Sequence, residues 1–311
     1  MYSTLQIGKT DTLRQRDLMM LFNRLISKKT NQNFKSQSAM EYLTTYGWAI
    51  LIIAIVIAVL FELNIFNPNY WTPKIPPGSC IVSRGTYGSA SLVGSCGEGI
   101  PKFVAQFNGQ NGYINIPDNS TLDPTQSITI TAWANIAAST SSCPGIVAKG
   151  GNAQYQLYQT SGYGVDPFVK TTGGSNWGGF GAVSQNQWNQ FVFTYDVATG
   201  SMMLYLNGKS DGSASATGNL ITTSNPIYIG QMQGCGYFNG DISNVQIYST
   251  ALSANNVQAL YVEGIGGTPI KLKDLVGWWP LNGNANDYSG NGNSGTASSV
   301  LYSASWYNNY V

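Results

Sequence analysis

Short runs of alternating apolar and polar residues follow one another through the last two thirds of the chain, separated by turns rich in Gly, Asn and Ser. In the run SITITAWANI, isoleucine and alanine fall on one face of a strand, and threonine and tryptophan fall on the other. Short strands spaced about ten residues apart are typical of a β-sandwich or barrel. We predict strands at residues 103–107, 113–116, 127–135, 146–149, 155–159, 188–195, 202–207, 227–229 and 240–248.

Two other segments have helical patterns. From Tyr46 to Phe61 the chain reads YGWAILIIAIVIAVLF, with no charged residue. A helix from about Met40 to Phe66 would be roughly 40 Å long at 1.5 Å per residue, and the hydrocarbon core of a bilayer is only ~30 Å thick. We therefore predict a helix that can cross a membrane. The second helix is predicted over residues 253–261, with Ser253 as N-cap and with Val257, Leu260 and Tyr261 turned inward.

The composition excludes several classes of function. Charged residues make up 9% of the 311 residues, against about a quarter in an average domain, and histidine is absent. Without histidine there is no Ser-His-Asp triad, no Cys-His dyad and no imidazole zinc site. A formal net charge of +1 also gives no broad basic surface for nucleic acid. The composition is typical of a secreted β protein, and we expect no nucleic-acid partner.

The charges are unevenly distributed. Residues 1–36 hold seven bases and two acids, whereas the rest of the chain holds eight bases and twelve acids. A basic leader, an apolar run and a weakly acidic body are typical of an exported protein whose start stays in the cytoplasm.

The residues between the leader and the apolar run read KSQSAMEY, at positions 35–42. This motif resembles the class III signal peptide of archaeal type IV pilins and archaellins. Ala39 stands where that pattern usually has Ser, and Ser36 stands where Gly is frequent. The resemblance implies that a membrane-embedded prepilin peptidase cuts between Ser36 and Gln37 and leaves the apolar helix on the mature protein.

The same resemblance implies how the helix is used. In that family the retained helix waits in the membrane and then packs among identical helices in a filament. It implies that Glu41, the fifth mature residue, neutralises the new amine of Gln37, because an unpaired buried charge costs several kcal/mol. The alternative is that Glu41 is a first-turn acid favoured by the helix dipole. The other residues expected in the assembly interface are Tyr42, Trp48, Ile52 and Ile55.

Residues 67–102 begin with a cluster of prolines, at positions 68, 73, 76 and 77, and hold the first two of the four cysteines. Prolines at this density end a helix and make a stiff connector. Between Cys80 and Cys96 the pattern predicts a β-hairpin with its turn near residues 85–91. Four cysteines allow three disulfide connectivities. Locality favours Cys80 with Cys96, which leaves Cys143 with Cys235; free thiols or a zinc site are the alternatives.

The β-rich runs also resemble a family as a set. Over about residues 103–262 the β-rich runs resemble the LamG-like, concanavalin A-like jelly roll, and they occur in the order of that family. The runs are FNGQNGYINIP, SITITAWAN, GIVAKG, QWNQFVFTYD, LYLNGK, YIG and FNGDISNVQIYSTALSANNVQALY. The resemblance implies two packed antiparallel sheets that bind carbohydrate or protein at the loops or the concave face. A segment that resembles the start of such a domain, LVGWWPLNGNANDYSG, lies instead at residues 275–290. Circular permutation explains this order; the alternatives are a truncated second repeat and a strand donated to the next subunit.

Catalysis is not expected. Glucanases with this fold need two carboxylates a few ångströms apart. After the apolar helix the glutamates are Glu98 and Glu263, neither has a second acid two residues away in a strand, and the aspartates are scattered singly. We predict no enzyme activity and no required cofactor.

Two groups of residues are candidates for ligand binding. Aromatic residues in Gly-rich loops can stack on sugar rings, and the candidates are Tyr163, Trp177 and Phe180; a core or rim position for Trp177 is an equal alternative. A calcium ion is a second hypothesis, with Asp241, Asp287 and Asn291 as its ligands by motif position. The favoured alternative is that these three residues form turns.

The sequence therefore predicts four parts: a cleaved leader at 1–36, an apolar polymerisation helix at 37–66, a Pro-rich neck at 67–102 and a LamG-like head at 103–311, closed by strands in 275–311. We expect a homo-oligomeric subunit of an extracellular type IV pilus-like filament, inserted in the cytoplasmic membrane before assembly, whose head binds carbohydrate or another cell-surface ligand. The alternatives are a membrane-anchored lectin-like receptor that does not polymerise and the archaellin of a motility filament.

Overall fold

The computed structural model describes residues 20, 24, 46–63, 65–66, 71–96, 99–137, 143–151, 153–161, 164–179, 181 and 183–309. The chain divides into two compact units, the first ending at Pro68 and the second beginning at Asn69.

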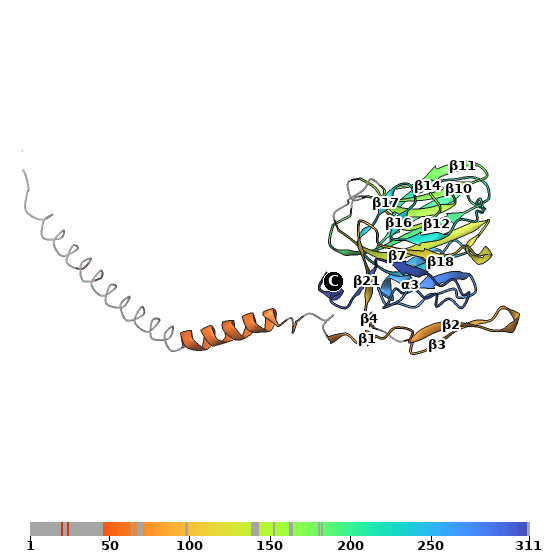
Figure 1. The fold of residues 1–311 in the computed structure, drawn as a ribbon. Coiled ribbons are helices and arrows are strands. Elements are labelled where there is room, and N and C mark those ends of the chain that lie inside the picture. The colour runs from red at the N-terminus through yellow and green to blue at the C-terminus, as the bar shows by residue number, and fades with distance from the viewer. Residues whose placement is uncertain are drawn as a thin grey trace, which may run out of the picture. The chain divides into compact units, whose positions relative to one another are not determined.

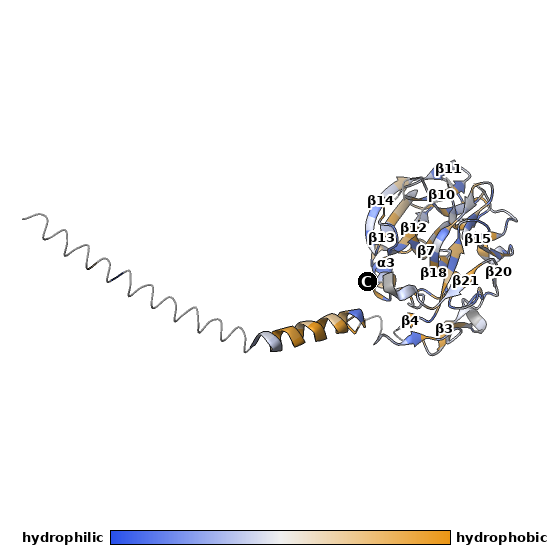
Figure 2. Cartoon of the chain, turned by 60° about the vertical axis from the view of Figure 1, so that its left-hand side comes forward, coloured by the Kyte–Doolittle hydropathy of each residue, from blue (hydrophilic) through white to orange (hydrophobic). Residues whose placement is uncertain are grey.

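In the first unit, residues 46–62 form an α-helix. Figure 2 shows that hydrophobic residues make up most of it, and its large apolar side chains are exposed around the whole helix, Trp48 to 72% and Ile52 to 59%. Within the part of the chain that the structure describes, no helix has the length and hydropathy that a membrane crossing needs. The rest of the predicted polymerisation segment, including Ser36, Gln37, Glu41 and Tyr42, lies outside the described residues.

The second unit is a β-sandwich of two antiparallel sheets (Figure 1). The seven-stranded sheet has the order β11 (Gly174–Trp177), β10 (Val165–Thr171), β9 (Tyr155–Gln159), β8 (Gly145–Lys149), β15 (Ile227–Ile229), β6 (Tyr113–Ile116) and β20 (Thr296–Ser298). The other sheet has the order β14 (Lys209–Ser215), β13 (Ser201–Leu206), β12 (Trp188–Asp196), β7 (Ser127–Ile136), β18 (Asn239–Tyr248), β5 (Val104–Asn108) and β21 (Leu301–Ser303), and β19 (Leu275–Trp279) pairs with β18 as its eighth strand.

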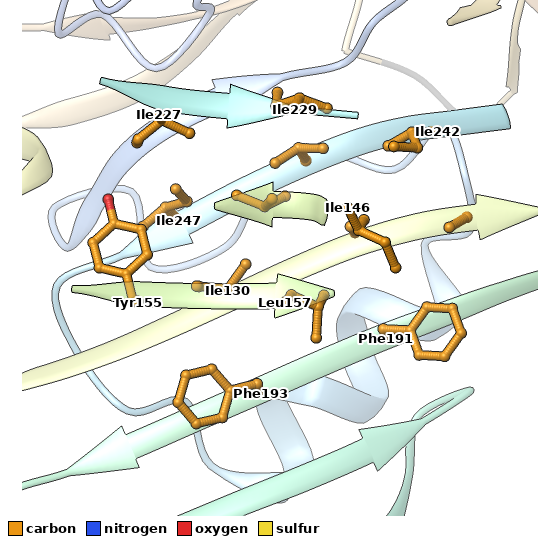
Figure 3. Close-up of a cluster of buried hydrophobic side chains, with 14 of the residues drawn as sticks. Ile130, Ile146, Tyr155, Leu157, Phe191, Phe193, Ile227, Ile229, Ile242 and Ile247 are labelled. Carbon is orange, nitrogen blue, oxygen red and sulfur yellow. The ribbon is translucent and has the colours of Figure 1, made fainter. Parts of the chain in front are cut away.

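The main hydrophobic core lies between the two sheets. Figure 3 shows side chains from both layers meeting there, among them Ile130, Phe191 and Phe193 from the eight-stranded sheet and Leu157 and Ile229 from the seven-stranded one. All five have no exposed surface. Burial of this size drives folding at roughly 25 cal/mol per Å² of apolar surface.

The eight-stranded sheet is also covered on its outer face. Nine of the ten residues of β7 are buried, so its face of threonine and tryptophan is buried as well as its core face. Helix α3 (Ala254–Val262) packs Val257 and Leu260 into one cluster on this side. As predicted, Ser253 is the N-cap of α3, and its Oγ accepts a 3.4 Å hydrogen bond from the backbone N–H of Asn256.

Tyr261, the third residue predicted to face inward, is half-buried. It stacks on Trp133 with 5.7 Å between ring centroids, in a second cluster on the same outer face.

The predicted hairpin is formed by β2 (Cys80–Arg84) and β3 (Ala90–Gly94), joined through the 3-10 turn η1 (Thr86–Gly88). It is held against the C-terminal segment: Val82 N–H donates to the carbonyl of Tyr288 over 2.8 Å, and Arg84 Nε donates to the carbonyl of Ser289 over 2.9 Å. The short strands β1 (Lys74–Ile75) and β4 (Ile100–Pro101) pair in parallel beside it. The described residues of the predicted neck, from 71 onward, are therefore part of the same compact unit as the sandwich.

The C-terminal strands complete sheets of their own chain. β19 pairs with β18, β20 with β6, and β21 with β5. The indole N–H of the fully buried Trp279 donates to the carbonyl of Asn293 over 2.8 Å. The described unit also contains a short antiparallel pair, β16 (Gln231–Met232) with β17 (Gly236–Tyr237). It has two further 3-10 turns, η2 (Ser120–Leu122) and η3 (Trp306–Asn309).

Candidate ligand-binding sites

The outer face of the seven-stranded sheet carries a continuous cross-strand row of side chains. Strand alternation turns these residues away from the core, because their neighbours Leu157, Ile227 and Ile114 point into it. We call these residues the aromatic row; the pairing register places them side by side in the order Trp177, Phe168, Gln156, Ala148, Tyr228, Asn115 and Thr296.

One end of the aromatic row is the pair Trp177 and Phe168. Phe168 is fully buried, whereas Trp177 lies on the edge strand β11 with 53% of its surface exposed. The two ring centroids are 5.1 Å apart. Packing on a buried ring holds the indole in place while one of its faces stays open to a ligand.

The other end is a tyrosine group. The rings of Tyr113 and Tyr228 meet edge to face with centroids 5.8 Å apart, and Tyr237 lies 6.3 Å from Tyr113. Between the two ends, the Gln156 Nε2 donates to the Gly150 carbonyl over 2.7 Å, and its Oε1 is buried without a hydrogen-bond partner. The row thus has aromatic groups at both ends, and its middle residues, Gln156 and Ala148, have at most 1% of their surface exposed.

Acidic and phenolic groups lie one step along the same face. Asp166 on β10 is opposite Tyr158 on β9. Burial raises the pKa of Asp166, and burial followed by repulsion from Asp166 raises the pKa of Tyr158. Both shifts favour the protonated form of the group.

Of the three aromatic residues proposed from the sequence, the structure describes Trp177. Tyr163 and Phe180 lie outside the described residues. The sequence did not single out Phe168, Tyr228 or Tyr113, because only the strand register brings them onto the same face as Trp177.

A polar cleft of about 380 Å³ lies at one end of the outer face of the eight-stranded sheet. Its centre is the cross-strand set Gln106 on β5, Asp241 on β18 and Asn135 on β7, which are directly opposite one another. The full lining is Gln106, Phe107, Asn108, Asn135, Ala137, Asn186, Asn239, Gly240, Asp241, Ser299 and Leu301.

The polar cleft holds one ionisable side chain among its described lining residues. Burial raises the pKa of Asp241 from 3.8 to about 6, against the opposing effect of a hydrogen bond from Gln106. Asn135 Nδ2 lies 3.5 Å from Asp241 Oδ2. The Oδ1 atoms of Asp241 and Asn135 are both buried and accept no hydrogen bond. Unpaired buried acceptors are costly, so this cleft favours a hydrogen-bond donor.

Asp241, Asp287 and Asn291 take part in different hydrogen-bond networks. Asp287 accepts from the backbone N–H groups of Trp278, Ser289 and Asn293 over 2.8–3.0 Å. Asn291 donates its amide to the carbonyls of residues 275 and 276. Both residues thus shape the loop after β19, as the turn interpretation expects. Within the described ranges, no group of three His, Cys, Asp or Glu side chains is placed to hold a metal ion.

Two disulfides are present, Cys80–Cys96 and Cys143–Cys235, which is the connectivity that locality favours. The first closes the β2–β3 hairpin, and the second joins the segment before β8 to the β16–β17 turn. Stable disulfides form in oxidising compartments, so they indicate an extracellular location.

Residues 108–258 match the profile of the family described as the Concanavalin A-like lectin/glucanases superfamily. The β-sandwich has the concanavalin A-like fold. This confirms the jelly roll expected from the β-rich runs. The match begins at residue 108, so it does not bear on the pilin-like motif at residues 35–42. No curated protein matches the chain.

Several solved structures are similar to this chain. A Bacteroides ovatus protein provisionally assigned as carbohydrate-binding is 17% identical, with a TM-score of 0.53 over 79% of this chain and 84% of that one. A heptameric SAP-like pentraxin from Limulus polyphemus is 16% identical, with a TM-score of 0.47 over 64% and 94% of the two chains. The sialidase domain CBM40 of Ruminococcus gnavus, bound to α2,3 sialyllactose, is 17% identical, with a TM-score of 0.42 over 52% and 99%. At 17% identity the likeness to the Bacteroides ovatus protein is one of fold.

Proposed function

We propose that the concanavalin A-like sandwich is an extracellular carbohydrate-binding head and that it binds a glycan at the exposed ends of the aromatic row, Trp177 and the tyrosine group. The observation that carries the proposal is the position of Trp177, which is half-exposed, packs at a tilt on the buried Phe168 and is in register with Tyr228 across the sheet. The similarity to a Bacteroides ovatus protein assigned as carbohydrate-binding supports it. The late position of the 275–290 segment makes this head a circular permutation of the family's usual order.

The chemistry of a glycan fits this face. A sugar ring has an apolar C–H face and a rim of hydroxyl groups, so it requires an aromatic surface beside amide and hydroxyl partners. Trp177 and the tyrosine group supply the first, and the half-buried Asn115 with the tyrosine hydroxyls supplies the second. Aromatic side chains lose little conformational entropy on binding, because they have two rotatable bonds.

The test uses the full chain in detergent, titrated with oligosaccharides that were first selected from a panel of immobilised glycans. The change Trp177→Ala is expected to weaken binding about tenfold or more, as removal of a buried aromatic anchor does. The matched control is Trp71→Ala, because Trp71 is a tryptophan exposed to 65% in the same unit but outside the row. Equal binding by both variants would contradict the proposal.

We also propose that the chain is a subunit of a type IV pilus-like filament. The supporting observation is the helix at residues 46–62, whose apolar side chains are exposed on every side. A helix that is apolar all round is stable in an apolar environment, such as a bundle of identical helices or a lipid layer. The class III-like motif at 35–42 then implies cleavage before Gln37 and pairing of its amine with Glu41.

Intact mass and N-terminal sequencing of material sheared from cells test the filament proposal. We expect a start at Gln37 in high-molecular-weight filaments. A start at Met1 in membranes would overturn it and would favour the membrane-anchored lectin-like receptor. If Gln37 is confirmed, the motility of cells that lack the protein separates an adhesive pilus from an archaellum.

A further inference from the structure

The polar cleft is a second candidate site, and it is independent of the aromatic row. It is built from β5, β7 and β18 of the eight-stranded sheet, whereas the row lies on the other sheet. Most of this outer face is covered by hydrophobic clusters, whereas the cleft combines seven polar residues with Phe107, Ala137, Gly240 and Leu301. Its polar side chains therefore have a different role from the packing beside them.

The groups that lack partners in the polar cleft are all acceptors. Asn135 is 5% exposed, and its Oδ1 accepts nothing; the same is true of Oδ1 of Asp241. The described lining contains no Lys or Arg, so no cation of the wall neutralises Asp241. A ligand that fits must bring donors and a positive charge.

A bare metal ion does not satisfy this geometry. Calcium takes six to eight oxygen ligands at about 2.3–2.6 Å, and tight sites use several carboxylates. The described lining supplies a single carboxylate, and the cleft, at about 380 Å³, is in the size range of small-molecule pockets. An organic cation fills such a space, and a lone ion does not.

The amide groups of the wall describe the rest of the ligand. Gln106, Asn186 and Asn239 surround Asp241 in the lining, and Ser299 adds a hydroxyl. Amides both donate and accept, so they match hydroxyl groups, which do the same. Leu301, exposed to 69% at the rim, offers an apolar surface for a C–H face.

Gly240 allows two strands to approach closely beside the polar cleft. Its φ is +139°, and a Cβ there would come within 2.1 Å of the carbonyl oxygen of Asn135. Any side chain at this position would push β7 and β18 apart beside the paired Asp241 and Asn135. The glycine thus lets the two strands approach at the floor of the cleft.

We propose that the polar cleft binds a small polyhydroxylated amine of monosaccharide size, such as a free amino sugar. Its ammonium group pairs with the carboxylate of Asp241 and the Oδ1 of Asn135. Its hydroxyl groups pair with the surrounding amides.

The experiment is calorimetric titration of the full chain in detergent with glucosamine, glucose, N-acetylglucosamine and calcium chloride, each alone. Glucosamine is expected to bind roughly tenfold to hundredfold more tightly than the two neutral sugars, as a charge-assisted hydrogen bond implies. Asp241→Asn keeps the shape of the side chain and is expected to remove that preference. Ala137→Trp is designed to fill the cleft while Asp241 is kept, and it is expected to remove binding. A thermal melt establishes that both variants fold.

Three results would overturn the inference: equal binding of the three sugars, binding of none of them, or binding of calcium alone that Asp241→Asn abolishes. Trp177→Ala serves as the control, because it alters the aromatic row and is expected to leave glucosamine binding unchanged. The two proposals can therefore fail separately.

Discussion

The two outer faces of the sandwich differ in what covers them. On the eight-stranded sheet, helix α3, the hairpin and the C-terminal segment build two hydrophobic clusters, and the tryptophans there are almost fully buried. On the seven-stranded sheet the edge tryptophan keeps half of its surface exposed. The same residue type thus serves stability on one face and is available to a ligand on the other.

This contrast teaches where binding can evolve on a two-sheet fold. A face that carries covering elements contributes apolar burial, and its side chains are fixed by packing. The seven-stranded sheet retains an exposed aromatic surface at its Trp177 edge, and the eight-stranded sheet keeps a site only where its cover ends, at the polar cleft. Three changes test this contrast on stability, in order of decreasing effect.

The largest effect is expected from the same substitution made on both faces. Trp278 is 3% exposed, and its indole N–H donates to Asn244 Oδ1 over 2.9 Å. Trp278→Ala should lower the free energy of unfolding by about 3–5 kcal/mol, because it leaves a cavity and removes a buried hydrogen bond. Trp177→Ala should lower it by less than about 1 kcal/mol, since surface changes cost little. Thermal unfolding followed by circular dichroism measures both; similar losses would refute the contrast.

The next effect concerns Asp241 and pH. Its pKa in the folded protein is about 6, above the ordinary 3.8, so the folded state holds the proton more tightly. Protonated Asp241 therefore stabilises the folded state. This stabilisation is complete below about pH 4 and is lost as the pH rises through 6. Asp241→Asn should therefore raise stability at pH 7 by about 1–3 kcal/mol and flatten the pH dependence between 4 and 7. Denaturant titrations at several pH values measure this, and an unchanged slope would contradict it.

The smallest effect is expected at the cap of the covering helix. Ser253→Ala removes the side chain that accepts from Asn256 N–H and should cost about 1 kcal/mol. Ser253→Asp keeps an acceptor and should recover most of the loss. The readout is the midpoint of urea unfolding; an equal loss in both variants would show that the cap does not hold α3 on the sheet.

Much of the fold could be predicted from local pattern. The runs at 113–116, 155–159 and 227–229 are strands with those bounds, and most other predicted strands differ by one or two residues at an end. Strands β10, β11 and β14 were missed, because glycine, proline and serine interrupt their alternation. The burial of both faces of β7 was missed as well, because alternation marks two faces and does not show that both are covered.

The sites were less accessible to sequence reasoning. Trp177 stood out because it is an aromatic residue in a Gly-rich run, and Asp241 stood out by its place in a motif. Gln106 and Asn135 did not stand out, because amides are common in this chain and only strand register puts them opposite Asp241. A site formed across strands depends on pairings between distant segments, which local pattern does not encode.

The pairing of the last strands also governs when this protein can fold during its synthesis. β5 and β6 are made early, yet their partners β21 and β20 are made last, with Gln106 opposite Leu301. Until the ribosome has added that segment, both sheets keep an unpaired edge and the core lacks Trp279. Because contacts this distant in sequence form slowly, the two sheets reach their full strand order only after this last segment has been made.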